Sequence, residues 1–155
     1  MQKAPGTYAL LLRADTVRTI EVGALGDMHV SPGTYVYVGS AFGPGGLQAR
    51  VGRHVRGDGS LHWHVDYLRA VTALAAVWYA YSEVRWECSW ASALRQHPKS
   101  TIPLEGFGAS DCDCSTHLVA FDALPSFADV RERMRPERPN HPPIQRADPS
   151  TVLTE

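Results

Sequence analysis

The chain is predicted to be an α/β domain of the α+β type, with a small central antiparallel sheet flanked by helices. Residues 33–41 are expected to be a strand, because tyrosine and valine alternate over residues 35–38 with the two-residue period of a strand. Residues 47–55 instead place an apolar side chain at every fourth position, which is typical of a helix packed by one face. Glycines in the segment 43–46 free the backbone to turn between the two.

The other elements follow in chain order. The apolar run 7–13 is expected to be a first strand buried on both faces, and 19–22 its hairpin partner. Loops are predicted at 23–32 and 98–116. Further strands are predicted from about 75 to 81 and, at a sheet edge, over 117–122. Further helices are predicted over 62–70, over 83–96 with Ser82 as N-cap, and to about 134 after a cap at Ser126.

One domain is expected over residues 1–135, since 155 residues are enough to bury a core. From Pro136 the chain carries several prolines and few apolar side chains. The segment 136–155 is therefore predicted to be a mobile C-terminal tail.

Composition excludes several classes of protein. Apolar residues make up 44% of the chain, yet none of its apolar runs approaches the roughly 18 residues that span a bilayer. The N-terminus lacks the apolar region of a signal peptide, so no membrane partner and a cytoplasmic location are expected. The three cysteines fit a reducing compartment.

Charge argues against a protein that simply coats nucleic acid, because the net charge is −1. A local basic cluster nevertheless follows the glycine-rich turn, at Arg50, Arg53, His54 and Arg56. Such a cluster suffices for a few phosphate contacts.

The strand and the helix together predict a group of reactive side chains. Tyr37 lies near the end of the strand, and Arg50 and His54 are four residues apart along one edge of the helix. A phenol, a guanidinium and an imidazole can position water, bind phosphate and move a proton. Each also has a plainer interpretation, as a half-buried strand tyrosine or an exposed helix arginine.

Four motifs in order resemble the GIY-YIG nuclease superfamily. GTY (6–8) is similar to its first signature triplet and YVG (37–39) to its second. LQARVGRH (47–54) is similar to the helix that follows, and Glu87 stands where the family keeps a metal-binding glutamate at a helix start. Three further stretches resemble its DUF123 branch: VGSAFG (38–43), HWHVDYL (62–68) and GFGASDC (106–112).

The resemblance, over roughly residues 6 to 122, implies a metal-dependent endonuclease that hydrolyses phosphodiester bonds in DNA. It implies that Tyr8 or Tyr37 holds or deprotonates the attacking water, with Tyr8 favoured as the base, and that His54 assists. Arg50 is expected to bind the phosphate and Glu87 to bind one Mg²⁺ or Mn²⁺ ion. A DNA-repair protein is an expected partner, because the DUF123 branch occurs alone or fused to DNA glycosylases.

Several alternatives stay open. Glu87 is also suited to the first turn of a helix through the helix dipole alone. The main rival function is a module that binds branched or damaged DNA without cutting it, and RNA remains an alternative substrate. Relatives carry a lysine shortly after the second triplet, where this chain has Ser40. Contacts to nucleic acid are expected from Ser40, Arg53, Arg56 and His62.

A zinc-stabilised interaction domain is the second rival. Cys112, Cys114 and His117 have ligand chemistry, but a fourth ligand is missing and the spacing of the cysteines is tight. His62, His64 or Asp111 could complete such a set only if the fold brings them near. Zinc is therefore not expected as the cofactor, and packing or local hydrogen bonding is the preferred role of these residues.

Overall fold

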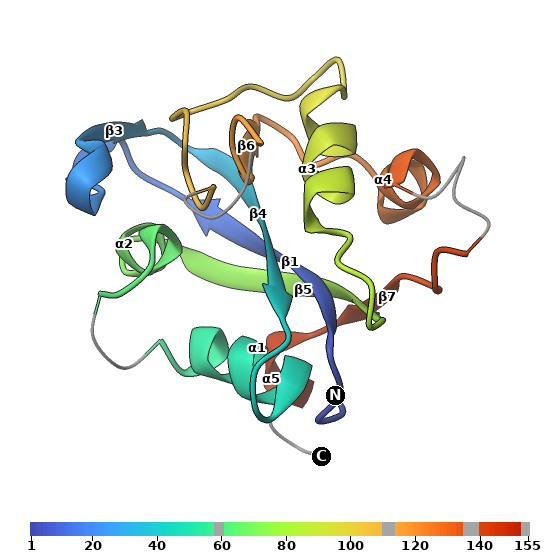
Figure 1. Cartoon of the computed structure of the whole chain (residues 1–155). Helices are drawn as coiled ribbons and strands as arrows, with labels where there is room; N and C mark the ends of the chain where they lie inside the picture. The colour runs from blue at the N-terminus through green and yellow to red at the C-terminus, as the bar shows by residue number, and fades with distance from the viewer. Residues whose placement is uncertain (58–60, 110–113, 135–139, 153–155) are drawn as a thin grey trace.

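The predicted fold class is confirmed by the computed structural model, which describes residues 1–57, 61–109, 114–134 and 140–152. A five-stranded antiparallel sheet has the order β6-β4-β1-β5-β7 (Figure 1). Its strands are β1 (Gly6–Ala14), β4 (Gly33–Ala41), β5 (Ala73–Tyr81), β6 (Leu118–Phe121) and β7 (Gln145–Ala147). The strand predicted at an edge is β6, and it lies there.

Helices cover both faces of the sheet (Figure 1). Along β1, Leu10 and Leu12 enter one hydrophobic core and Leu11 enters the other, as the two-residue period of a strand requires. The first core is completed by α1 (Gly46–Arg56), α2 (His64–Arg69) and α5 (Pro149–Val152). The second is completed by α3 (Glu87–Arg95) and α4 (Phe127–Met134).

The predicted pairing of the second strand is wrong. β2 (Arg18–Glu21) pairs with β3 (Asp27–Val30) in a separate two-stranded sheet, with the short 3-10 helix η1 (Gly23–Leu25) between them. β1 cannot take β2 as a partner, because β4 and β5 already occupy its two edges. The loop predicted over 23–32 therefore contains a strand.

The predicted mobile tail is packed against the domain in its described part, residues 140–152. β7 pairs with the outer edge of β5, which continues the sheet by one strand. Ile144 is 5% exposed and Val152 is completely buried, and His141 accepts a hydrogen bond from the indole of Trp90 at 2.7 Å. A few well-placed apolar side chains and one free sheet edge thus outweigh the proline-rich composition.

Helix α3 begins four residues later than predicted. Ser82 does not cap it, since its hydroxyl accepts hydrogen bonds from the Val84 backbone and the Trp86 indole in the turn before the helix. Glu87 is consequently the first residue of α3, and Trp90, Ala91 and Leu94 form its buried stripe. Ser126 does cap α4, by accepting a hydrogen bond from the Asp129 N–H. Among the described residues, no helix is long and apolar enough to cross a membrane.

Candidate functional site

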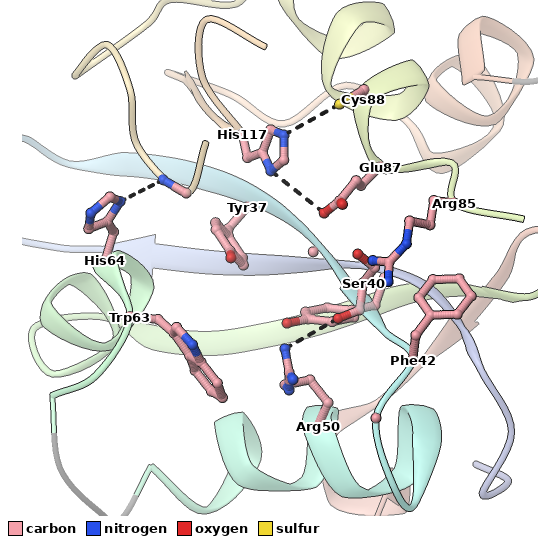
Figure 2. Close-up of a pocket in the computed structure, with 14 residues that line it drawn as sticks. Tyr37, Ser40, Phe42, Arg50, Trp63, His64, Arg85, Glu87, Cys88 and His117 are labelled. Atoms are coloured by element: carbon pink, nitrogen blue, oxygen red, sulfur yellow. Dashed lines mark hydrogen bonds and ion pairs between the residues drawn. The ribbon is translucent and has the colours of Figure 1, made fainter. Parts of the chain in front are cut away.

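A cavity of about 780 Å³ opens beside the end of β4. Its walls come from β4, α1, the start of α3 and the segments around Gly108 and His117 (Figure 2). Tyr8, Tyr37, Arg50 and Glu87 all line it. Four of the five expected catalytic residues therefore share one cavity, although they come from two strands and two helices.

The fifth residue, His54, contacts the cavity through Tyr8. The Tyr8 hydroxyl and His54 Nε2 are joined by a buried hydrogen bond of 2.9 Å. The bond depends on Gly39, which lies directly opposite Tyr8 in the β1–β4 ladder. A Cβ at position 39 would lie 2.6 Å from the Tyr8 hydroxyl, so only glycine leaves room for the phenol.

Burial governs the protonation of this pair. Desolvation raises the pKa of Tyr8 far above its usual value of about 10, although nearby Arg50 opposes that rise. Desolvation also lowers the pKa of His54 to about 4, so the imidazole is neutral at pH 7. His54 Nδ1 is buried and has no hydrogen-bond partner among the described residues. The pair is thus a neutral phenol bonded to a neutral imidazole.

Tyr37 stands beside Tyr8 with its side chain toward the cavity (Figure 2). The two ring centroids are 6.4 Å apart, and the other side of Tyr37 meets the edge of Phe107 at 6.0 Å. Desolvation and the neighbouring Tyr8 raise the pKa of Tyr37 well above 10. Gly108 allows this packing, because a Cβ there would lie 2.8 Å from the Tyr37 ring.

Two arginines face the cavity from different elements (Figure 2). Arg50 on α1 donates from Nη1 to the Ser40 carbonyl at 3.3 Å, and its guanidinium lies 4.4 Å from the centre of the Trp63 ring. Arg85, just before α3, lies 4.4 Å from the centre of the Phe42 ring. The cavity therefore presents two cations, each held against an aromatic face.

Glu87 is held at the N-terminal end of α3, where the helix dipole favours a negative charge. Its carboxylate lies 3.8 Å from His117 Nδ1, and its side chain is 20% exposed. It is the only carboxylate lining the cavity among the described residues. An oxygen ligand is therefore available to a metal ion on the side of the cavity across from Arg50.

The structure places only one of the four residues expected to contact nucleic acid at the cavity. Ser40 lines the cavity, whereas Arg53, Arg56 and His62 do not. Arg53 forms a bidentate ion pair with Asp66, at 2.9 and 3.0 Å. Arg56 and His62 are exposed outside the cavity. Their contact with nucleic acid stays a prediction.

Several cavity residues were not singled out by sequence reasoning. Arg85 belongs to a segment with no strong pattern of its own, whereas Phe42 and Trp63 lie inside the VGSAFG and HWHVDYL motifs but were not chosen as site residues. His64, considered from the sequence only as a possible zinc ligand, lines the cavity, and its Nδ1 accepts a hydrogen bond from the Gly108 N–H at 2.7 Å. Helix α2 begins at His64, two residues later than predicted.

The fold and the cavity define a small α+β domain whose reactive groups converge from segments far apart in the chain. A protein-family model, Domain of unknown function DUF123, matches residues 7–137. The chain therefore belongs to the DUF123 family. Neither a curated protein nor a solved structure matches it.

Proposed function

We propose that this domain is a metal-dependent endonuclease of GIY-YIG type that hydrolyses phosphodiester bonds in DNA. The observation that carries the proposal is the convergence on one open cavity of two phenols, a guanidinium and a carboxylate. A buried imidazole bonded to one of the phenols adds a proton acceptor. These are the groups needed to position a water, remove its proton and bind a phosphate.

The proton path runs inward through Tyr8. A buried phenol with a raised pKa is a poor base alone, so the proton must continue to another group. In the proposed reaction His54 Nε2 receives the Tyr8 proton while the Tyr8 oxygen takes one from the attacking water. A neutral imidazole can carry its proton on either nitrogen; this step requires it on Nδ1, which leaves the Nε2 lone pair free to accept.

The phosphate is bound between the two arginines. The oxygen of the water forms a bond to phosphorus, and the opposite phosphorus–oxygen bond breaks with the leaving oxygen in line. Arg50 has five N–H donors in a planar fork, which suits two phosphate oxygens and the added charge of the transition state. Arg85 supplies a second cation at the Ser40 side of the cavity, where relatives carry lysine.

The carboxylate of Glu87 fits a hard divalent cation. Mg²⁺ is commonly held by one or two carboxylates and keeps several waters, and this partly exposed carboxylate borders a cavity with space for them. An Mg²⁺ or Mn²⁺ ion held by Glu87 would stabilise the negative charge that develops on the leaving oxygen. The protein's part is to hold the carboxylate at the helix start.

A DNA-binding module that does not cut is the second candidate. It is favoured by the paired cations and aromatic rings of the cavity, Arg50 with Trp63 and Arg85 with Phe42. Such surfaces bind phosphates and stack exposed bases without further chemistry. The two candidates differ in whether Glu87 takes part in a reaction.

The deciding experiment pairs cleavage with binding. The parent protein is incubated with nicked, flapped, branched and plain duplexes in Mg²⁺ or Mn²⁺, and cleavage of one of them is expected. Glu87→Gln keeps the shape of the side chain and removes its charge. Cleavage should fall by about 10²–10³-fold, as for other losses of a transition-state stabiliser, while DNA affinity is retained.

Glu83→Gln is the matched control, because Glu83 is exposed on the same segment and does not line the cavity. It should cut and bind like the parent protein at one fixed salt concentration. Equal cleavage by Glu87→Gln and the parent would contradict the catalytic assignment. Binding without cleavage on every substrate would favour the binding module.

A further inference from the structure

Two sulfurs and an imidazole nitrogen meet at the rim of the cavity. Cys88 lies in the first turn of α3, whereas Cys114 and His117 come from the segment before β6. Their ligand atoms all lie within 4.8 Å of one another, and Cys88 Sγ is 3.9 Å from His117 Nε2 (Figure 2). The proposed reaction uses none of these three atoms.

The spacing suits a tetrahedral zinc ion. Zinc binds sulfur at about 2.3 Å and nitrogen at about 2.0–2.1 Å, so its ligand atoms are roughly 3.5–3.8 Å apart. The Cys88–His117 distance of 3.9 Å is close to this value. The structure pairs Cys88 and Cys114 as a disulfide, with a Cα–Cα distance of 6.2 Å. A two-electron reductant such as a thiol would break that bond, and small side-chain rotations would then separate the two sulfurs enough to hold one ion.

The second nitrogen of His117 is already oriented by Glu87. With Nε2 facing Cys88, Nδ1 lies 3.8 Å from the Glu87 carboxylate. Histidines that bind metals usually present their other ring nitrogen to such a partner, which fixes the tautomer and the ring plane.

The backbone holds both sides of the cluster in place. His117 donates its N–H to the Phe107 carbonyl at 2.8 Å and accepts at its own carbonyl from Val38 at 2.9 Å. Arg95, at the end of α3, donates to the Thr116 carbonyl at 3.0 Å. These bonds tie the segment before β6 to β4 and to α3.

We propose that Cys88, Cys114 and His117 bind one zinc ion, with its fourth position open toward the cavity. Two thiolates and an imidazole suit zinc and disfavour Mg²⁺ or Mn²⁺, which prefer oxygen ligands. The ion would clamp α3 to the segment before β6 and hold His117 against Glu87. The earlier zinc hypothesis paired Cys114 with Cys112, which lies outside the described residues. This proposal uses Cys88 instead and does not depend on nuclease activity.

Metal analysis of the reduced protein tests the site. The chain is purified with a thiol-free reductant, supplied with zinc, dialysed and assayed for zinc by mass spectrometry. One zinc per chain is expected for the parent protein. Cys88→Ser and His117→Ala should each lose nearly all of it, and His29→Ala, at an exposed histidine on β3, should retain it.

Cobalt gives a readout that does not require a variant to fold. Co²⁺ added to the metal-free parent should produce a thiolate-to-metal charge-transfer band and the visible bands of tetrahedral cobalt, and zinc should abolish both. A reduced protein that binds no zinc, or an octahedral cobalt spectrum without thiolate bands, would overturn the proposal. So would full zinc retention in a folded Cys88→Ser variant. A thiol count that stays at one free cysteine under reductant would show a disulfide instead.

Discussion

Gly39→Ala tests whether close packing of the two strands creates the Tyr8–His54 pair. The added Cβ would lie 2.6 Å from the Tyr8 hydroxyl, 2.7 Å from Tyr8 Cζ and 3.2 Å from the Tyr37 ring. Tyr8 is 1% exposed and cannot swing into solvent without leaving the core. The phenol must therefore shift and stretch or break its 2.9 Å bond to His54.

Three terms set the size of the effect. Overpacking of this kind costs about 1–3 kcal/mol, and an unsatisfied buried hydrogen-bonding group costs about 1–3 kcal/mol more. Alanine also reduces the conformational entropy of the unfolded chain, which stabilises the folded state by about 0.4–1 kcal/mol. The net destabilisation is about 1–5.6 kcal/mol, and for a domain of this size each kcal/mol lowers the melting temperature by about 2–4 °C.

The assay is urea unfolding followed by tryptophan fluorescence, together with the DNA cleavage assay. Gly43→Ala is the matched control, since a Cβ there would meet nothing within 4 Å, and its stability should stay within about 0.5 kcal/mol of the parent. Cleavage should also fall for Gly39→Ala, and Gly43→Ala is a control for stability only, because Gly43 lines the cavity. Equal stability of Gly39→Ala and the parent protein would refute the argument that glycine is required for this contact.

Three further results are expected. Arg50→Ala should weaken both DNA binding and cleavage, unlike Glu87→Gln, because a phosphate contact exists before and during the reaction; a gel shift at fixed salt measures this. The pKa of His54 is about 4 in the folded protein and about 6.5 in the unfolded chain. Neutral buried His54 therefore stabilises the fold fully above about pH 6.5, and this stabilisation is lost as the pH falls from 6.5 toward 4. Urea unfolding of the parent and His54→Gln across that range should show a steeper slope in the parent, because His117, whose pKa is also lowered, remains in both proteins. Removal of residues 140–155 should destabilise the domain by about 3–6 kcal/mol, because Ile144 and Val152 leave the core; unchanged thermal unfolding would show that their burial contributes little.

The sequence by itself determined the elements whose side-chain period is clear. The alternation in β4, the apolar run of β1 and the four-residue repeat of α1 predict their types and bounds to within a residue or two. Each period depends on the local geometry of a strand or a helix, so it can be recognised without knowing the partners. Tyr37, Arg50 and His54 could be chosen as candidates for the same reason.

Only the tertiary structure decided which elements meet. The residues of β2 predict a strand but not which strand lies beside it, so its pairing with β3 could not be predicted. The tail likewise contains few apolar residues, and their burial depends on an edge of β5 that is formed by distant segments. Contacts of this kind are non-local, and no short stretch of sequence carries them.

In the cavity, too, the sequence identifies some candidate residues, but only the fold sets their positions. Glu87 could be proposed from its place in the motif order, but its position beside His117 follows from the packing of α3 against β4 and β6. Cys88 and Cys114 are 26 residues apart, and nothing in their spacing pairs them. The residue types can be read from the sequence, whereas the distances between the side chains are set only when helices pack on both faces of the sheet.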